Sequence, residues 1–406
     1  MLINISVYMK VDKGGVIVDV LFIPSWYSTE KNPTNGSFFK EQALALRNAG
    51  VNVILAYVDV TLENISNEDS KVKIYYDNSI LVYRIKEKKI KKTGNIGTML
   101  AFKKGIKKIY KKLEEDKRGK FDIIHLHSTP WAGLGAISIS KASNTPLVIT
   151  EHSSYFSRYK VSKIEELFFR YIMKNASYNI CVSETLKEYV QKYTSNNIDI
   201  IPNMVDVNEF SIANNEEEIR RKKFSFACVC YLNKNKSVDN LINAFSLEYK
   251  GKDAELIIGG DGPERSYLER LAKELKIETQ VIFKGALSRN DVIKEMQNCS
   301  VFVLPSRFET FGVVLVEALA CGKPVITTRN GGSEGIVNEL NGKVVDVGDI
   351  ELMAKAMKEI KDNYEIYDSN LIREDCVKRF SSENVANEII GVYNKIINGF
   401  GEKYEK

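Results

Sequence analysis

Short apolar segments rich in β-branched residues alternate along this chain with amphipathic segments. Residues 16–24 and 51–58 are apolar, and residues 37–49 between them are amphipathic. The alternation continues through further apolar segments at residues 121–126, 147–150 and 178–183. Strands that alternate with helices in this way predict parallel sheets covered by helices on both faces. We therefore expect an α/β fold.

The pattern pauses once, in the polar residues 208–223, and then starts again. We expect new strands at 224–231, 255–259, 281–283 and 301–304 and a helix at 237–245. A chain of 406 residues exceeds what one hydrophobic core usually organises. We predict two Rossmann-like domains facing across a cleft, residues 1–203 and residues 204–383, with a helix at about 384–406 that packs back on the first domain. Ligands of such sheets bind beyond the carboxyl ends of the strands, so we place the site in that cleft.

Composition and the first residues favour a cytoplasmic protein. Apolar residues make up 44% and charged residues 27% of the chain, as in ordinary soluble proteins. No stretch approaches the roughly 18 consecutive apolar residues of a membrane-spanning helix, and the first residues lack a secretory signal pattern. The six cysteines are scattered, so we expect buried free thiols. Cys228 and Cys230 would share one face of a strand without completing a zinc site.

Positive charge is concentrated between residues 84 and 120. This segment holds 15 Lys or Arg and 4 Asp or Glu, a local charge of +11 in a chain whose net charge is +5. Its lysines surround an apolar stripe at helical spacing in residues 102–113. The lysines form either a solvated helix face or a surface that adsorbs to an anionic membrane, at about 1 kcal/mol per basic residue. We favour adsorption, peripheral on the inner face of the plasma membrane, and expect no nucleic-acid partner because no aromatic stacking motif accompanies the charge.

An apolar helix predicted at residues 313–322 contains a single charged residue, Glu317. An unpaired carboxylate there would cost several kcal/mol, so Glu317 needs a partner. That partner is either an Arg or backbone donor, or the ribose diol of a nucleotide. Glu309 precedes the helix, whose first N–H groups near Gly312 suit an anion. We place a diphosphate there, with Glu309 facing a sugar.

The two glutamates stand eight positions apart, with seven residues between them, and Glu317 is followed by Ala-x-Ala-x-Gly-x-Pro-Val-Ile. This pattern resembles the family 4 glycosyltransferases, or glycosyl transferases group 1, of the GT-B fold. Further segments resemble the same family along nearly the whole chain: residues 26–42, 125–127, 150–152, 181–184, 201–206, 224–245, 257–263, 283–285 and 304–306.

The resemblance implies a retaining hexosyltransferase that moves a sugar from a nucleoside diphosphate sugar to a saccharide or lipid-linked saccharide, in surface polysaccharide or glycoconjugate synthesis. It implies no cofactor and no metal. The catalytic residues carried over are Glu309, His152, which matches the family histidine beside the donor sugar, and Lys236, which matches its phosphate-binding lysine. The donor-binding residues are Glu317, Gly312, Phe311, Thr310, Arg307, Gly260, Gly36 and Tyr231. His127 and Trp26 are the acceptor or cleft residues.

Several alternatives remain open from the residues themselves. Tyr231 stands where the family often has a second phosphate-binding Arg, which keeps a non-catalytic sugar-nucleotide-binding partner of another transferase in view. Another GT-B enzyme, a phosphorylase or an epimerase, is the other alternative. Gly36 follows Asn35 and is either an ordinary turn or a point of close approach to a ligand. The three histidines are either core residues or site residues, and we expect them to hold no zinc.

Overall fold

The computed structural model describes residues 18–29, 35–158, 161–213 and 223–404. Residues 16–17 of the first expected strand, residues 30–34 of the motif at 26–42 and residues 214–222 of the polar stretch lie outside this range. The chain divides into two compact units. One comprises the residues up to Ile149, Leu167–Tyr178 and the residues from Ile389, and the other comprises Thr150–Glu166 and Asn179–Glu388. The boundary at residue 203 stays a prediction.

The N-terminal half of the chain forms an eight-stranded sheet in the order β3-β4-β2-β1-β5-β6-β7-β8. Its strands are β1 (Asp19–Pro24), β2 (Asn52–Thr61), β3 (Lys73–Asp77), β4 (Ile80–Lys88), β5 (Ile123–His127), β6 (Leu147–Glu151), β7 (Tyr178–Cys181) and β8 (Ile198–Ile200). β1 pairs in parallel with β2 and β5, and β2 with β4, whereas β3 is antiparallel to β4. This β3–β4 hairpin is the one departure from the parallel arrangement among the strand pairs described.

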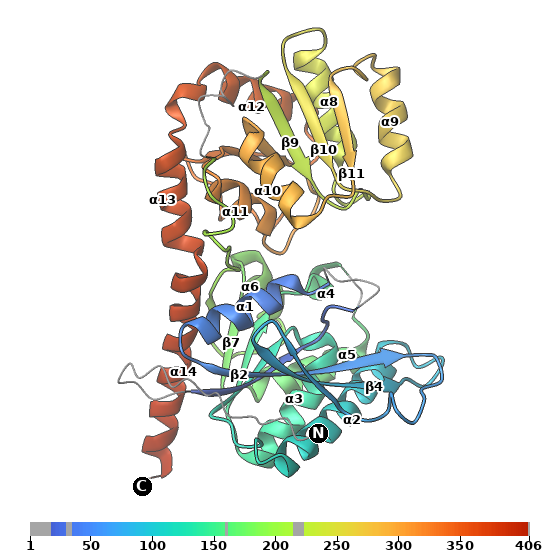
Figure 1. Ribbon diagram of the computed structural model, residues 1–406, viewed down its shortest axis with the longest axis vertical. Helices are drawn as coiled ribbons and strands as arrows, with labels where there is room; N and C mark the ends of the chain where they lie inside the picture. Colours follow the sequence, from blue (N-terminus) through green and yellow to red (C-terminus); the bar gives the residue numbers. More distant parts are fainter. Residues whose placement is uncertain (1–17, 30–34, 159–160, 214–222, 405–406) are drawn as a thin grey trace, which may run out of the picture. The chain divides into compact units, whose positions relative to one another are not determined.

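Helices cover both faces of this sheet. They are α1 (Ser37–Asn48), α2 (Gly94–Glu115), α3 (Thr129–Ser143), α4 (Tyr155–Arg158), α5 (Lys163–Lys174) and α6 (Glu184–Val190). Figure 1 shows α1 on one face and α2 and α3 on the other. Every residue of β5 and β6 is buried as a result, which is why these strands are continuous apolar runs in the sequence.

The second sheet has six parallel strands in the order β11-β10-β9-β12-β13-β14. These are β9 (Ser225–Val229), β10 (Glu255–Gly259), β11 (Val281–Gly285), β12 (Val301–Leu304), β13 (Val325–Thr328) and β14 (Gly342–Val345). The chain builds outward from β9 to β11 and then crosses back to place β12 beside β9. The order of the strands therefore reverses between β9 and β12, and open α/β sheets bind ligands beyond the carboxyl ends of the strands at such a point.

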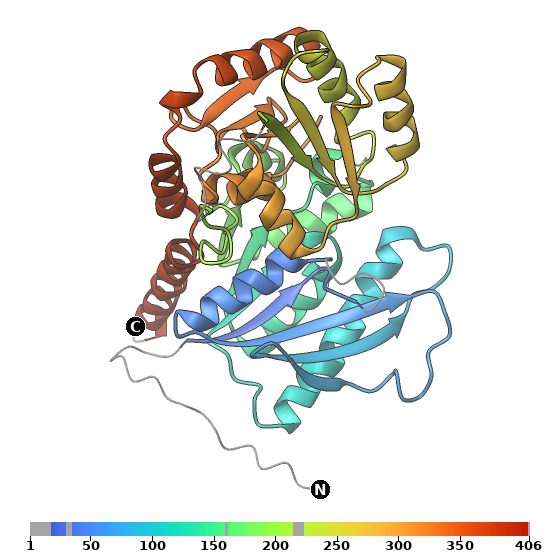
Figure 2. The same cartoon turned by 45° about the horizontal axis from the view of Figure 1, so that its top comes forward.

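The remaining helices are α8 (Val238–Tyr249), α9 (Arg265–Glu274), α10 (Arg289–Asn298), α11 (Val313–Ala320), α12 (Ile350–Asp362), α13 (Ser369–Phe380) and α14 (Ser382–Tyr404), with a 3₁₀ turn at Tyr364–Ile366. Figure 2 shows helices on both sides of the second sheet. Local sequence fixes several of their starts. Ser288 and Asp291 form a reciprocal capping box at α10, and the Asp349 carboxylate accepts the Leu352 N–H at α12.

The last helix, α14, occupies the segment where we expect a helix at 384–406. Its residues from Ile389 belong to the first compact unit. There the Tyr393 hydroxyl lies 2.5 Å from Nδ1 of His125, and both side chains are fully buried. With two Rossmann-like parallel sheets present, the α/β fold class predicted from the sequence is confirmed.

Candidate active site

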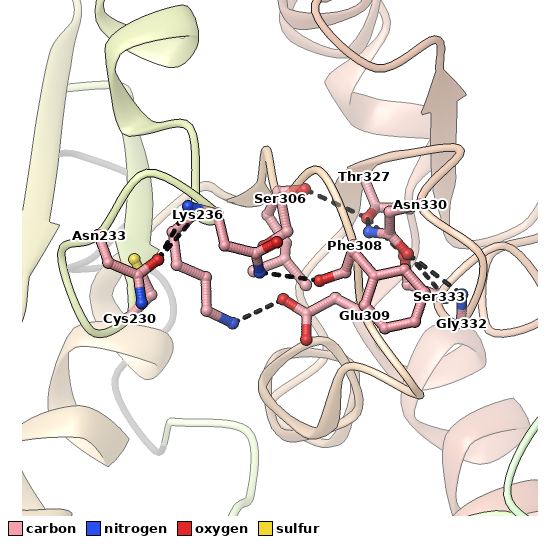
Figure 3. A network of polar contacts seen from close by, with 12 residues as sticks. Cys230, Asn233, Lys236, Ser306, Phe308, Glu309, Thr327, Asn330, Gly332 and Ser333 are labelled. Atoms are coloured by element: carbon pink, nitrogen blue, oxygen red, sulfur yellow. Dashed lines mark hydrogen bonds and ion pairs between the residues drawn. The ribbon is translucent and has the colours of Figure 1, made fainter. Parts of the chain in front are cut away.

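Three loops meet at the reversal of strand order in the second sheet. They are residues 230–237 after β9, residues 305–312 after β12 and residues 329–333 after β13. Because these three strands are neighbours and parallel, their carboxyl ends lie at the same edge of the sheet. Figure 3 shows side chains from all three loops converging there.

Lys236 and Glu309 form an ion pair at this edge. The Lys236 ammonium lies 2.6 Å from Oε1 of Glu309, and the side chains are 21% and 15% exposed (Figure 3). Burial disfavours the charged lysine, but the neighbouring Glu309 carboxylate outweighs burial and raises the pKa of Lys236. The Lys236 ammonium therefore stays charged near neutral pH. The structure brings together the two residues to which we assign diphosphate and sugar.

Asn233 shapes the loop that carries Lys236. Its side-chain oxygen accepts the N–H groups of Asn235, at 3.0 Å, and of Lys236, at 3.2 Å. The N–H of Lys236 also bonds the main-chain oxygen of Asn233 at 3.0 Å. An asparagine that bonds the backbone two and three residues ahead holds a tight turn, so the direction of the Lys236 side chain is set locally.

The loop after β13 braces the segment that carries Glu309. Oδ1 of Asn330 accepts the N–H groups of Gly332 and Ser333 at 3.3 and 3.1 Å and the Ser333 hydroxyl at 2.8 Å (Figure 3). The main-chain oxygen of Asn330 accepts the Glu309 N–H at 3.2 Å. A Cβ at Gly332 would lie 2.4 Å from the Thr310 carbonyl carbon. Only glycine permits this close approach.

Helix α11 begins directly after the Glu309 segment. Phe311 is buried and packs edge-on against Phe380, with 5.9 Å between ring centroids. Gly312 caps the helix in a left-handed conformation and has no side chain to accept the first helical N–H groups. Those groups and the partial positive charge of the helix start suit an anionic ligand. Thr310 is half-buried between Glu309 and this start.

Glu317 is buried in α11 and is paired with an arginine. Arg289, at the start of α10, donates from Nη1 to Oε1 of Glu317 at 2.7 Å. The same guanidinium bonds Glu209 at 3.0 Å and lies over the Phe210 ring, 4.5 Å from its centroid. The pair supplies the partner that a buried carboxylate requires, which is the structural alternative left open above. Ribose binding by Glu317 stays a prediction.

His152 follows β6 and belongs to the same compact unit as Glu309. Its Nδ1 lies 2.9 Å from Oδ1 of Asn203, an acceptor, so Nδ1 carries the proton. Burial lowers the pKa of His152 to about 3, although the bond to Asn203 opposes this shift. His152 is therefore a neutral imidazole near neutral pH.

Trp26, Gly36 and His127 belong to the first compact unit. His127 is fully buried and stacks on Phe22, with 3.8 Å between ring centroids. Gly36 starts α1 in a left-handed conformation, and a Cβ there would lie 3.0 Å from the Trp26 carbonyl oxygen. Trp26 packs against Phe39 at 5.0 Å between centroids. Packing and turn formation account for His127 and Gly36, and their roles in ligand binding stay predictions.

The other predicted donor residues lie around the loop after β9. Tyr231 is 63% exposed. Nε of Arg307 donates to the Ser237 hydroxyl at 2.8 Å, which ties the exposed Arg307 to the start of α8. A Cβ at Gly260 would lie 1.9 Å from the Cys230 oxygen, so the two loops touch through their backbones. The sulfur atoms of Cys228 and Cys230 lie 4.0 Å apart on one side of the chain, as expected.

Sequence reasoning missed Arg289, Asn235 and Asn330. The Asn-Gly-Gly run at 330–332 is a turn signal that could have indicated a loop, although not its contact with Glu309. Nothing in the sequence links Arg289 to Glu317. Within the described ranges, no group of three or more His, Cys, Asp or Glu could hold a metal ion. No helix among the described residues is long and apolar enough to cross a membrane.

Comparison with known proteins gives the chain its family. Residues 210–374 match the family described as glycosyl transferases group 1, and residues 36–209 match glycosyltransferase family 4. An uncharacterized glycosyltransferase of Methanocaldococcus jannaschii is 30% identical over 278 residues, 68% of this chain and 76% of that protein.

Two further similarities come from an enzyme and a solved structure. A UDP-Gal:alpha-D-GlcNAc-diphosphoundecaprenol alpha-1,3-galactosyltransferase of Escherichia coli is 25% identical over 73% of this chain and 75% of its own length. The structure of Anabaena HepE in complex with UDP superposes with a TM-score of 0.71 at 18% identity, over 93% of this chain and all of that one. Its fold, two Rossmann-like sheets of the GT-B type, is the fold found here. The chain belongs to the glycosyl transferases group 1 family and is a glycosyltransferase.

Proposed function

We propose that this glycosyltransferase uses a nucleoside diphosphate sugar and transfers its hexosyl group to a saccharide or lipid-linked saccharide with retention of configuration. The Lys236–Glu309 ion pair carries this proposal. A cation for a diphosphate and a carboxylate for a sugar stand 2.6 Å apart beside the start of α11. The similarity to an enzyme named for a UDP sugar and a lipid diphosphate acceptor supports the donor and acceptor classes, as does a UDP-bound structure of the same fold.

In the proposed reaction the chain's own groups stabilise the leaving diphosphate. The Lys236 ammonium and the N–H groups at the start of α11 offset the negative charge that develops as the glycosidic bond to phosphate breaks. Glu309 accepts hydrogen bonds from hydroxyls of the donor sugar and so fixes its orientation. The acceptor hydroxyl attacks from the face that the diphosphate leaves, and a phosphate oxygen takes its proton. This scheme needs no pair of catalytic carboxylates of the glycosidase type.

A thermal-shift panel of UDP-, GDP- and ADP-sugars identifies the donor, because a ligand that binds only the folded protein raises its stability. The preferred sugar nucleotide should then release nucleoside diphosphate in the presence of a saccharide acceptor, and proton NMR of the product should show the anomeric configuration of the donor. A donor that stabilises the protein but never releases diphosphate would favour the non-catalytic alternative. Product of the opposite configuration would contradict retention.

We also propose that the enzyme adsorbs to anionic membranes through α2. Four lysines of this helix, Lys104, Lys107, Lys108 and Lys111, are exposed. Lys104 and Lys108 both form ion pairs with the buried Glu87, at 3.0 and 2.7 Å, so its single negative charge neutralises only part of their positive charge. Leu100, one turn before Lys104 on the same helix, is exposed and offers apolar contact.

Vesicle sedimentation tests this proposal. The protein should bind vesicles containing phosphatidylglycerol at low salt, bind phosphatidylcholine vesicles weakly, and be released as salt rises. Lys107→Glu with Lys111→Glu should abolish binding, because neither lysine forms an ion pair among the described contacts. Exposed Lys250 and Lys276, in the other compact unit, provide a control pair. Equal binding by both double variants would contradict the assignment to α2.

A further inference from the structure

Asn235 connects the loop that carries Lys236 to the segment that carries Glu309. Its side-chain amide donates to the Phe308 main-chain oxygen at 3.0 Å. Its own main-chain oxygen accepts the Arg307 N–H at 2.7 Å. The loop after β9 is therefore fastened at two points to the residues that immediately precede Glu309.

Each of these two segments is also held by further hydrogen bonds. Asn235 and Lys236 belong to one turn closed by the Asn233 side chain, so Asn235 cannot shift without moving Lys236. Glu309 is tied through its N–H to Asn330 in the third loop. Besides the bond from the Arg307 side chain to Ser237, the two hydrogen bonds of Asn235 hold the backbone of the Lys236 loop against the backbone of the Glu309 segment.

We infer that Asn235 is a positioning residue that sets the spacing between the Lys236 ammonium and the Glu309 carboxylate. This inference rests on the proposed function, in which the two groups hold the diphosphate and the sugar of one donor. Both side chains are long and rotatable, so a fixed backbone spacing restricts where their charged ends can meet. The Asn235 side chain bonds the Phe308 backbone, so it acts on the site through the positions of Lys236 and Glu309. A displacement of about 1 Å in such a site can cost a hundredfold in rate.

A thermodynamic cycle tests the inference without any transfer assay. Lys236→Met, Glu309→Gln and their combination are made in the wild-type chain and in Asn235→Ala, and the thermal midpoints of the eight proteins are compared. The non-additive shift that reports the Lys236–Glu309 interaction should fall by at least half in the Asn235→Ala background. An unchanged interaction would overturn the inference. If the wild-type enzyme transferred no sugar, the proposed function would fail while this cycle still decided the role of Asn235.

Kinetics supply the second readout. Asn235→Ala should lower kcat about tenfold, the loss expected for one hydrogen bond, with KM for the donor and Kd for UDP within about twofold of wild type. Asn235→Asp has the same size but no hydrogen to donate to the Phe308 oxygen, and it should lower kcat at least as much. Asn243→Ala is the matched control, because it removes a hydrogen bond of 2.8 Å that the Asn243 side-chain amide donates to the Asp239 main-chain oxygen inside α8. This variant should leave kcat unchanged.

Two results would contradict the positioning role. Wild-type kcat in Asn235→Asp would show that the donated hydrogen bond is unnecessary. A fall in thermal midpoint and UDP affinity with kcat unchanged, in Asn235→Ala, would show that the residue only stabilises the loop. A selective loss of kcat in both variants, with the control unaffected, supports the inference.

Discussion

Replacing Arg289 should lower the free energy of unfolding, because the buried Glu317 carboxylate loses its arginine partner. In Arg289→Met the Glu317 side chain, 6% exposed, loses the guanidinium that lies 2.7 Å from it. Removing one partner of a fully buried pair costs about 3–5 kcal/mol. The arginine side chain is 37% exposed, so water can partly replace it, and we reduce the expectation to about 1.5–3 kcal/mol.

Glu317→Gln should cost less, about 1 kcal/mol, because the amide oxygen still accepts from Arg289 and no charge is left unpaired. The double variant Arg289→Met with Glu317→Gln should lose less stability than the two single losses added together. Amide hydrogen exchange of α11, followed by mass spectrometry, measures the free energy of opening in this unit directly. Exchange no faster in Arg289→Met than in wild type, or strictly additive losses, would refute the reasoning.

The same variants separate the two interpretations of Glu317. A purely structural carboxylate predicts that Glu317→Gln binds UDP as tightly as wild type. A carboxylate that also binds the ribose diol predicts a loss of about 1–2 kcal/mol in UDP binding, roughly 5- to 30-fold in Kd, because a charged acceptor is replaced by a neutral one. Isothermal titration of UDP with both proteins distinguishes these outcomes.

Two further predictions concern stability. Burial lowers the pKa of His152 to about 3 from 6.5, so the unfolded chain binds the proton more readily and stability falls as pH drops below about 6.5. Between roughly pH 6 and 4, the wild type should lose about 1.4 kcal/mol of stability per pH unit more than His152→Gln. Urea midpoints of the two proteins that fall in parallel with pH would contradict this. Gly332→Ala places a Cβ 2.4 Å from the Thr310 carbonyl carbon and should lower the free energy of unfolding by about 1–3 kcal/mol. The control Gly335→Ala places a Cβ where nothing lies within 4 Å and should be near neutral. Equal thermal midpoints for the two variants would contradict the close approach at Gly332.

The hydrophobic pattern of the sequence was sufficient to predict the buried strands but not the exposed ones. Fully buried strands such as β5 and β6 are apolar at nearly every position, and apolar runs between amphipathic segments indicate them directly. β3 has four exposed residues and one half-buried residue, so no buried face alternates with a polar one. Without that alternation the β3–β4 hairpin leaves little signal in the sequence.

The motif indicated the pair at the centre of the site, but not what holds it in place. Lys236 and Glu309 were identified by their resemblance to family positions, and the strand order brings them within 2.6 Å. Asn235 and Asn330 act mainly through main-chain atoms of segments about 73 and 21 residues away in sequence. Such contacts depend on which strands are neighbours, a property of the sheet order that no local pattern contains.

The rate of transfer by Glu309→Gln tests the central claim most directly. The variant keeps the size of the side chain and removes the charge that we assign to holding the donor sugar. With the sugar nucleotide that best stabilises the wild-type protein, kcat should fall about a hundredfold, as for loss of one transition-state contact, while the variant still folds cooperatively and its UDP affinity stays close to wild type. Near-normal transfer by Glu309→Gln would contradict the assignment of Glu309 and, with it, the proposed site.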